Sequence, residues 1–315
     1  MIPLFDAHCD TIYESYVQGK NLLKENPRGH LDLKRTAVFS PYAQFFAAFF
    51  DSKGKSEAEL KEIFQRQYAV FQNMLEENGD CISLCRTKEE AESAFSQGKA
   101  AAFFSVEGAE LLACSIEGLE QAHALGARAV NLTWNHSNAL SGSIGDCPHV
   151  GLSSLGRQFV SRMQDLGMLV DVSHLSEAGF WDVIALAKKP IMASHSNARF
   201  LWNHPRNLTD AQFLAIVANG GVAGLNMYAG FLGENPDFST IEAHLAHFLS
   251  LGGEDHIAIG GDWDGCDRLP RGMEQGRAGL SDLYTYLLQR NYSKSLLHKL
   301  YFQNLMRVVG EVCTI

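Results

Sequence analysis

The sequence predicts an α/β fold, a (β/α)8 or TIM barrel that forms a single domain over residues 1–315. A chain of 315 residues has the length of one such barrel and is short for two domains with a linker. Eight short apolar runs recur along the chain, mostly separated by longer segments with the spacing of amphipathic helices. The runs are continuously apolar rather than alternating, which is typical of parallel strands covered by helices.

The predicted strands and helices alternate through most of the chain. The strands are expected, in order, at 3–6, 44–50, 100–106, 127–132, 168–172, 190–193, 221–225 and 256–260. Helices are expected at 57–77, 88–97, 115–125, 154–166, 176–188, 209–218, 240–250, 279–290 and 294–310. Ser176 and Thr209 are typical helix N-caps, and Gly126, Gly167 and Gly220 stand where helices should end. Right-handed crossovers between such units close a barrel.

Composition and charge exclude several classes of protein. With 26 basic against 36 acidic residues the net charge is −10, and no Lys/Arg cluster offers a nucleic-acid surface. No run approaches the roughly 18 to 20 apolar residues of a membrane span, and the first residues do not resemble a secretion signal, so no membrane association is expected. Seven cysteines cannot all pair, which indicates a reducing, cytoplasmic location. Cys81 and Cys85 lack the second pair of a zinc motif and are predicted to be core residues.

Metal-binding residue types stand where five of the predicted strands end, and the active sites of such barrels are built at this rim. The candidates are His8 and Asp10 after the first strand, Glu107 after the third, His174 after the fifth, His195 after the sixth and Asp262 after the eighth. Imidazole nitrogens and carboxylate oxygens suit zinc and similar divalent ions. The histidines away from this rim, His244, His247, His256 and His298, are expected to be structural.

The candidate ligands are too many for one tetrahedral zinc that keeps an open position. A pair of metals that share a carboxylate is the economical arrangement, and Glu107 is the natural bridge. No lysine lies between Lys99 and Lys188, so a lysine-derived bridge on the fourth strand is excluded.

Two aspartates follow the eighth predicted strand, and an arginine follows the sixth. Asp262 beside a metal-bound hydroxide can accept its proton and return it to the leaving group. Asp264 is the rival, but its place two residues further on favours a loop role. Either aspartate also fits a simple turn before Gly265. Arg206 follows the sixth strand, and taken alone it would be expected on the surface.

The chain resembles the membrane (renal) dipeptidase family of zinc peptidases, in particular its soluble bacterial members, within the amidohydrolase-like superfamily. The motifs run through nearly the whole chain: DAHCDT (6–11), HLDL (30–33), AQFFA (43–47), SVEG (105–108), LTWN (132–135), DVSH (171–174), SHSNAR (194–199), HPRNLTD (204–210) and GGDWDG (260–265). Each motif is weak alone, whereas their order and separations are specific.

The resemblance implies a metal-dependent hydrolase barrel with two Zn²⁺ ions per chain. His8 and Asp10 would bind one ion, His174 and His195 the other, and Glu107 would bridge them. It further implies that Arg206 binds the terminal carboxylate of the substrate and that Asp262 is the acid/base and also faces the substrate. Tolerance of a D-residue at the C-terminal position and a homodimer are implied in the same way.

The chain departs from the family's pattern at the substrate pocket. Trp134 stands where eukaryotic members have a substrate-contacting histidine, and His136 is the candidate to replace it. Cys9, between the two ligands of the first strand, is expected to be a packing residue. Tyr228, after the seventh strand, is a candidate for the roof of the pocket and fits core packing equally well.

The sequence therefore predicts a metallodipeptidase in which a metal-bridging hydroxide attacks the peptide bond of a dipeptide. Two alternatives stay open. One is another binuclear metal amidohydrolase or lactonase that acts on a small cyclic amide or ester, and the other is a barrel that has lost catalysis and serves as a binding protein.

Overall fold

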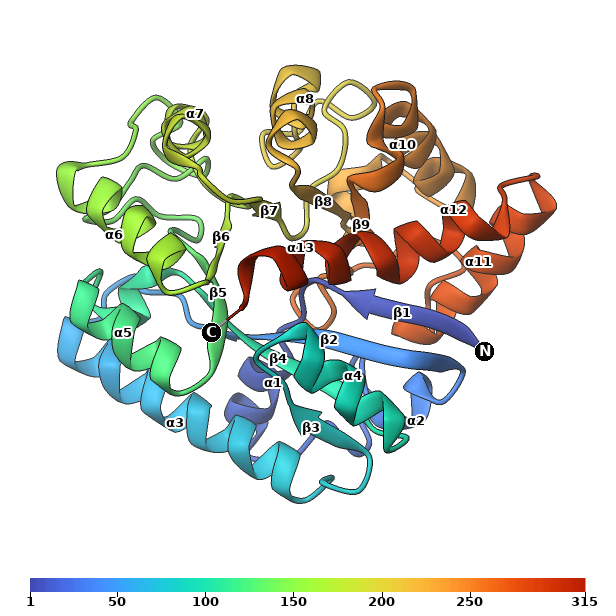
Figure 1. The fold of residues 1–315 in the computed structure, drawn as a ribbon, viewed down its shortest axis with the longest axis horizontal. Coiled ribbons are helices and arrows are strands. Elements are labelled where there is room, and N and C mark those ends of the chain that lie inside the picture. The colour runs from blue at the N-terminus through green and yellow to red at the C-terminus, as the bar shows by residue number, and fades with distance from the viewer. Residues whose placement is uncertain (315) are drawn as a thin grey trace.

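A closed barrel of eight parallel strands forms the centre of the molecule, which confirms the predicted fold (Figure 1). The computed structural model describes residues 1–314. The barrel strands are β1 (Ile2–Asp6), β2 (Phe39–Phe49), β4 (Ala100–Glu107), β5 (Ala127–Asn131), β6 (Leu169–Asp171), β7 (Met192–Ala193), β8 (Val222–Leu225) and β9 (Ile257–Ile259). Pairing between β2 and β4 closes the barrel, since the other strands pair in the order β2-β1-β9-β8-β7-β6-β5-β4.

A ninth strand, β3 (Ile82–Leu84), was not expected from the sequence. It pairs with the first residues of β4, whereas the later part of β4 pairs with β5. Three residues carry too little periodicity to predict a strand. The prediction that Cys81 and Cys85 are both core residues is wrong for Cys81, which is exposed just before β3, whereas Cys85 is buried. β2 also begins five residues earlier than predicted, because Phe39 already pairs with Ile2 across the Ser40-Pro41 interruption.

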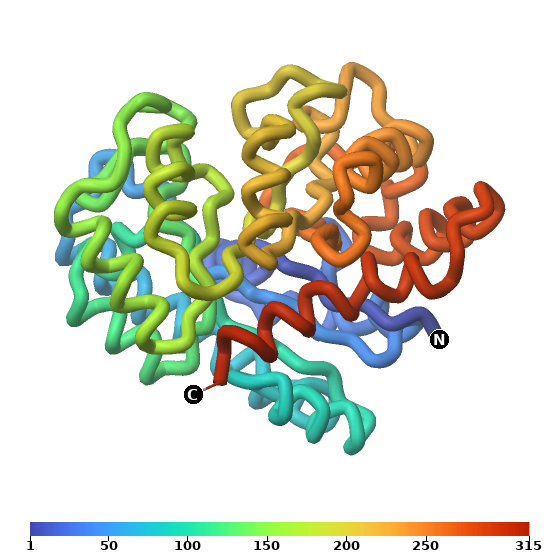
Figure 2. The backbone as a smooth tube through the Cα atoms, turned by 45° about the horizontal axis from the view of Figure 1, so that its top comes forward, coloured from blue at the N-terminus to red at the C-terminus, as the bar shows by residue number. Residues whose placement is uncertain are grey.

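Helices cover the outside of the barrel (Figure 2). They are α1 (Thr11–Gln18), α2 (Leu33–Thr36), α3 (Glu57–Glu76), α4 (Lys88–Ser96), α5 (Ile116–Ala124), α6 (Ser154–Asp165), α7 (Glu177–Leu186), α8 (Asp210–Asn219), α9 (Ala229–Leu232), α10 (Phe238–Ser250), α11 (Gly279–Gln289), α12 (Lys294–His298) and α13 (Asn304–Val312). The chain also forms the 3-10 helical turns η1 (Ala109–Leu112), η2 (Gly253–Asp255) and η3 (Gly276–Ala278) and the π-helical turn η4 (Lys299–Gln303). No helix within residues 1–314 combines the length and the apolar character needed to cross a bilayer.

The predicted helix boundaries hold where they rest on capping residues. The Ser176 hydroxyl accepts a hydrogen bond from the Gly179 N–H over 2.9 Å, and Thr209 forms a capping box with Gln212. Gly126, Gly167 and Gly220 follow α5, α6 and α8, and all three have positive φ. The segment predicted as a helix over 294–310 is helical throughout, but a π-helical turn, η4, separates α12 from α13.

The C-terminal helix α13 closes the end of the barrel where the strands begin. Its apolar side chains belong to the same buried cluster as the inward-facing Phe5, Phe45 and Phe103, whose ring centroids are 5.1 to 5.5 Å apart. Arg307 of α13 donates hydrogen bonds to the carbonyl oxygens of Gly220 and Asp255, just before β8 and β9. Because α13 fills this end of the barrel, we expect the active site at the opposite rim, where the strands end.

Candidate metal centre and active site

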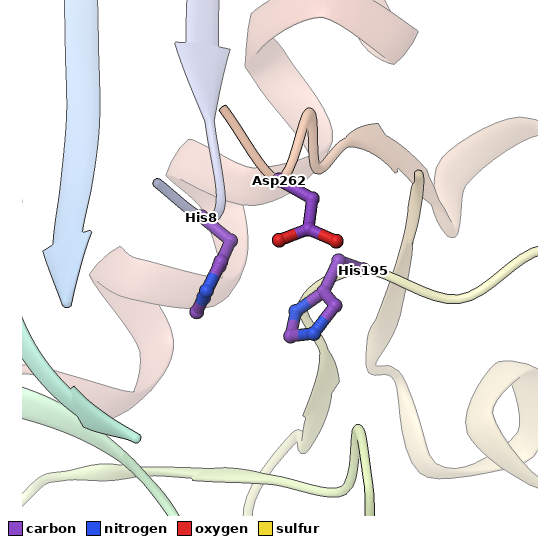
Figure 3. Close-up of side chains that lie close together, drawn as sticks. All are labelled: His8, His195 and Asp262. Carbon is purple, nitrogen blue, oxygen red and sulfur yellow. The ribbon is translucent and has the colours of Figure 1, made fainter. Parts of the chain in front are cut away.

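Six acidic and histidine side chains from five strand ends meet at the carboxyl rim of the barrel, as their places in the sequence predicted. They are His8 and Asp10 after β1, Glu107 at the end of β4, His174 after β6, His195 after β7 and Asp262 after β9. All six are buried. Figure 3 shows His8, His195 and Asp262 reaching from three separate segments toward one shared space.

Glu107 stands between two groups of potential ligands. Its Oε2 lies 3.4 Å from His8 Nε2, which is itself 3.5 Å from Asp10 Oδ2. Its Oε1 lies 3.0 Å from His174 Nε2 and 3.6 Å from His195 Nε2. A tetrahedral ion with ligand atoms about 2.0–2.1 Å away holds those atoms about 3.3 Å apart. Each carboxylate oxygen of Glu107 therefore completes one set of ligand atoms with the spacing that a metal ion requires.

The hydrogen bonds of the two histidines turn their lone pairs toward each other. His174 Nδ1 lies 2.9 Å from Asn135 Oδ1, an atom that only accepts, so this nitrogen carries the proton and Nε2 does not. His195 Nδ1 lies 2.7 Å from Ser194 Oγ. The Ser194 hydroxyl donates its own proton to the Asp171 carboxylate, so it accepts from His195 Nδ1, and His195 Nε2 carries no proton. The two Nε2 atoms are 3.0 Å apart. Such a pair of lone pairs beside a carboxylate oxygen repels unless a cation lies between them, so these residues fit a metal ion.

The other set of ligand atoms also lacks partners in the protein. His8 Nε2 and Asp10 Oδ1 are buried and make no hydrogen bond within the part of the chain that the structure describes. Leaving buried polar atoms unsatisfied is costly, and a bound cation would remove that cost.

The protonation states suit metal binding. Burial raises the pKa of Glu107, but His8 and His174 outweigh burial and hold that pKa well below its ordinary value. Burial and the charge of Arg206 lower the pKa of His174 to about 4, and burial with His8 and Arg206 lowers the pKa of His195 well below 6.5. At neutral pH the Glu107 carboxylate is therefore ionised and His174 and His195 are neutral, the states in which such groups bind metal ions.

The surroundings of His8 favour a positive charge. Burial lowers its pKa, but Glu107 and Asp10 together raise it well above the ordinary value. A metal ion bound by His8 would supply this positive charge in place of the proton.

Two buried carboxylates that could not be assigned from the sequence fix the ends of strands that carry candidate ligands. Asp171, the last residue of β6, accepts the backbone N–H groups of Ser173 and Ser194, each over 3.0 Å. A further hydrogen bond joins its side chain to Ser194, the partner of His195. Asp6, the last residue of β1, accepts the N–H groups of His8 over 3.1 Å and Gly261 over 3.0 Å. Such outer partners orient the ligands themselves.

In the sequence, the role of these two carboxylates is indicated only by their position at the end of a predicted strand. An ionisable residue that ends a predicted parallel strand is buried by the fold, and it must find hydrogen-bond partners among the neighbouring strand ends.

The loop after β9 holds Asp262 in an unusual backbone conformation. Asp262 and Asp264 have φ of 57° and 66°, in the left-handed region that is costly for residues other than glycine. The Asn226 amide donates a hydrogen bond to Asp262 Oδ2 over 3.0 Å, and burial is the main cause of its raised pKa. Asp264 instead accepts hydrogen bonds from the His30 N–H and the Thr11 hydroxyl, so it organises loops, as expected for it.

Arg206 is buried, with 7% of its surface exposed, although the sequence alone indicated a surface residue. Its Nε and Nη2 have no hydrogen-bond partner among residues 1–314, and its guanidinium carbon lies 5.4 Å from the centre of the Phe231 ring. Burial lowers its pKa to about 10, so it remains charged at neutral pH. Arg206 lines a small hollow together with His174. A buried cation with free donors is suited to bind an anionic group.

A cavity of about 520 Å³ opens at this rim of the barrel, and His8, His195 and Arg206 are not in its lining. Asp10, Glu107, His174 and Asp262 lie in its lining. Aromatic side chains form much of the remaining wall, namely Tyr13, Phe49, Trp134, Tyr228 and Phe231. The volume suits a ligand of a few hundred daltons.

The structure brings Tyr228 to the cavity but not His136. The His136 ring faces two carboxylates, with Nε2 3.6 Å from Asp51 and Nδ1 4.0 Å from Asp146. Trp134 and Asn135 line the cavity in that part of the chain. Cys9 is fully buried with its thiol 3.4 Å from the Phe45 carbonyl oxygen, in keeping with a packing role.

The chain is similar to proteins named as dipeptidases over nearly its whole length. The family described as membrane dipeptidase, peptidase family M19, matches residues 1–315. An uncharacterised dipeptidase of Schizosaccharomyces pombe is 31% identical over 97% of this chain and 79% of its own. The dipeptidase tcpJ of Claviceps purpurea is 30% identical over 98% of this chain and 76% of its own.

Solved structures agree with this similarity. A metallopeptidase of family M19 called dipeptidase AC superposes with a TM-score of 0.92 at 27% identity, over 100% of this chain and 99% of its own. A metallopeptidase from Rhodobacter sphaeroides, bound to a phosphinate mimic of L-Ala-D-Ala, gives a TM-score of 0.88 at 27% identity over 99% of both chains. The predicted resemblance is therefore confirmed: this chain belongs to the membrane dipeptidase family, peptidase family M19, and is a metal-dependent hydrolase of peptide bonds.

Proposed function

We propose that this protein is a binuclear zinc dipeptidase that cleaves the single peptide bond of dipeptides, including those with a D-residue at the C-terminal position. The position of Glu107 carries the proposal, because its two carboxylate oxygens face two separate sets of ligand atoms at 3.0 to 3.6 Å. His8 and Asp10 would hold one Zn²⁺, and His174 and His195 the other. When bound, two such ions supply a water molecule of lowered pKa and polarise the scissile carbonyl.

Asp262 moves the proton in this proposal. Hydrolysis forms a bond from the water oxygen to the carbonyl carbon and breaks the bond from that carbon to the nitrogen. Asp262 accepts the proton that the water loses and then donates it to the departing nitrogen, so the amine leaves uncharged. The hydrogen bond from Asn226 keeps one carboxylate oxygen in place while the other faces the reaction.

Arg206 and the aromatic walls position the substrate. The free N–H groups of Arg206 bind the C-terminal carboxylate, and Tyr228 contributes to the wall of the pocket. A carboxylate held in this way restricts the enzyme to substrates whose scissile bond precedes the last residue. The bound L-Ala-D-Ala mimic in the Rhodobacter sphaeroides relative supports a pocket that accepts a D-residue.

The test is hydrolysis of L-Ala-L-Ala and L-Ala-D-Ala by zinc-loaded enzyme, compared with the same dipeptides amidated at the C-terminus. We expect rapid cleavage of the free dipeptides and at least tenfold slower cleavage of the amides. Equal rates on free and amidated dipeptides would contradict the role of Arg206. Cleavage of cyclic amides or lactones without cleavage of dipeptides would favour the amidohydrolase or lactonase alternative, and no activity with zinc would favour the binding protein.

Three further properties belong to this proposal. Residues 1–315 form one catalytic domain, the protein works in the cytoplasm, and it is a homodimer. All seven cysteines are free, which supports a reducing compartment. Light scattering of the purified protein tests the oligomeric state.

A further inference from the structure

The mouth of the pocket carries more negative charge than the proposed metal centre uses. Six carboxylates line the cavity, and no Lys or Arg side chain lines it within residues 1–314. Asp10, Glu107 and Asp262 are assigned to the metal centre and the proton transfer. Asp264 is held by His30 and Thr11. Glu14 and Asp267 have no role in the proposed metal centre, the proton transfer or the loop structure.

Glu14 lies one helical turn outward from a proposed metal ligand. The Glu14 N–H donates a hydrogen bond to the Asp10 carbonyl oxygen over 3.1 Å, so the two residues are stacked on one face of α1. Asp10 is buried, whereas Glu14 is half-buried. The face of α1 that carries Asp10 to the base of the pocket therefore carries Glu14 toward its mouth.

Asp267 approaches the mouth from the loop after β9. It is exposed, and its carboxylate is a hydrogen-bond partner of the Tyr228 hydroxyl. The only side-chain partner of Glu14 in the described part of the chain is the neutral amide of Gln18, 2.9 Å away. Neither carboxylate forms an ion pair with a lysine or arginine within residues 1–314. Two carboxylates without an ion-pair partner in the described part of the chain thus lie in the lining of one cavity, although the charge of Arg268 also reaches Tyr228 beside Asp267.

Arg206 indicates how a ligand of this cavity would be oriented, although it lines a small adjoining hollow with His174 rather than the cavity itself. Arg206, with its unpartnered buried donors, lies close to His174 and His195, on the side of β6 and β7. Glu14 and Asp267 lie on α1 and the loop after β9. A dipeptide whose C-terminal carboxylate binds Arg206 directs its N-terminal residue toward α1 and that loop.

We infer that Glu14 and Asp267 form a subsite for a positively charged side chain on the N-terminal residue of the substrate. This inference rests on the proposed dipeptidase function and names its preferred substrates: dipeptides that begin with lysine, arginine or a similar cationic residue. The aromatic side chains of Tyr13 and Tyr228, on the same two segments of the wall, suit the aliphatic stem of such a residue. The cationic end then lies between the two carboxylates.

The experiment compares Lys-Ala with norleucine-Ala, which keeps the aliphatic stem and lacks the charge. For the zinc-loaded enzyme at low salt, we expect kcat/KM to be about tenfold higher for Lys-Ala, the effect of one or two charges across a partly wet gap. The ratio of kcat/KM for Lys-Ala to kcat/KM for norleucine-Ala should fall toward one in the double variant Glu14→Gln, Asp267→Asn. The same ratio should fall in the wild type when salt is added. Glu76→Gln, at an exposed glutamate at the end of α3, is the matched control and should leave the ratio unchanged.

The outcomes separate the two proposals. Hydrolysis of Ala-Ala together with equal rates on Lys-Ala and norleucine-Ala would overturn the cationic subsite and leave the dipeptidase function standing. A Lys-Ala preference that survives in the double variant would also overturn the subsite. No hydrolysis of any of these dipeptides would overturn the dipeptidase function and the subsite with it.

Discussion

The Asp6 carboxylate accepts a hydrogen bond from the indole N–H of Trp263 over 2.7 Å, and this contact ties the end of β1 to the loop after β9. The same carboxylate accepts the N–H groups of His8 and Gly261. Asp6 is completely buried, and burial raises its pKa, although these hydrogen bonds oppose the shift. One side chain outside the lining of the cavity thus fixes the backbone beside both a proposed ligand, His8, and the proposed acid/base, Asp262.

The first prediction is that Asp6→Asn weakens metal binding as well as catalysis. An asparagine oxygen carries less charge, and its amide group would face N–H donors that need an acceptor. We expect zinc affinity, measured by competition with a chelator, to fall about 10- to 100-fold, the usual effect of losing an outer partner. Asp282→Asn, at an exposed position of α11, is the control. Unchanged zinc affinity in Asp6→Asn would show that Asp6 only supports the fold.

Much of this site could be predicted from the sequence because strand ends in a parallel barrel converge by geometry. A residue such as Glu107 needs only to end a strand in order to reach the rim. Asn135 and Ser194 could not be assigned in the same way, since their role depends on which ring nitrogen they face. The orientation of His136 depends on Asp51 and Asp146, which are distant in sequence. The short strand β3 carried too little periodicity to be recognised.

The second prediction concerns the bridge. Glu107→Gln replaces one of two charged oxygens with an amide that cannot bind a cation. We expect activity to fall to background and the metal content, measured by elemental analysis, to fall from two ions per chain to one or fewer. Glu110→Gln is a useful control, because the Glu110 carboxylate lies near Ser52 rather than near the ligands. Two bound ions and full activity in Glu107→Gln would refute the bridge.

The third prediction tests the proposed carboxylate-binding residue. Arg206→Met removes the unpaired donors and keeps much of the packing against Phe231. Losing a charge-assisted hydrogen bond costs about 1.5–3 kcal/mol, so kcat/KM for free dipeptides should fall about 10- to 100-fold. The rate on amidated dipeptides should change little, since they lack the charge that Arg206 binds. Arg271→Met, at an exposed position, should alter neither rate. A matching loss on the amidated dipeptides would assign Arg206 a structural role instead.

The fourth prediction concerns Gly265, whose backbone passes directly over the site. A Cβ atom there would lie 2.1 Å from Asp10 Oδ2 and 2.6 Å from Asp262 Oδ1, so both carboxylates would have to move. We expect Gly265→Ala to lower kcat by at least about a hundredfold, because displacements of about 1 Å at a reacting centre have effects of this size. Gly79→Ala meets only ordinary contacts of 3.5 Å and 3.6 Å and should retain activity. Wild-type kcat in Gly265→Ala would mean that the loop shifts without disturbing the site.

The last prediction concerns His244, a fully buried histidine outside the proposed metal centre. Its Nδ1 accepts the Ala198 N–H over 3.1 Å, and its Nε2 lies 3.1 Å from the Leu232 carbonyl oxygen, so it joins the loops after β7 and β8 in its neutral form. Burial lowers its pKa from 6.5 to about 4. Below pH 6.5 His244 therefore becomes protonated in the unfolded chain, whereas in the folded protein it stays neutral down to about pH 4. The stability that neutral His244 contributes is complete above pH 6.5 and is lost as the pH falls toward 4.

The direction of this pKa shift can be tested by comparing the unfolding free energies of the wild type and His244→Leu as the pH is lowered. At pH 7.5 the variant should be less stable by about 1–3 kcal/mol, because two buried backbone groups lose their partner. The gap in unfolding free energy should narrow steadily between pH 6.5 and pH 5, since only the wild type loses stability through this residue. The histidines of the metal centre are present in both proteins and cancel in the difference. His149→Leu, at an exposed histidine, should show neither the destabilisation nor the trend. A gap that stays constant down to pH 5 would mean that His244 is as easily protonated in the folded protein as in the unfolded chain.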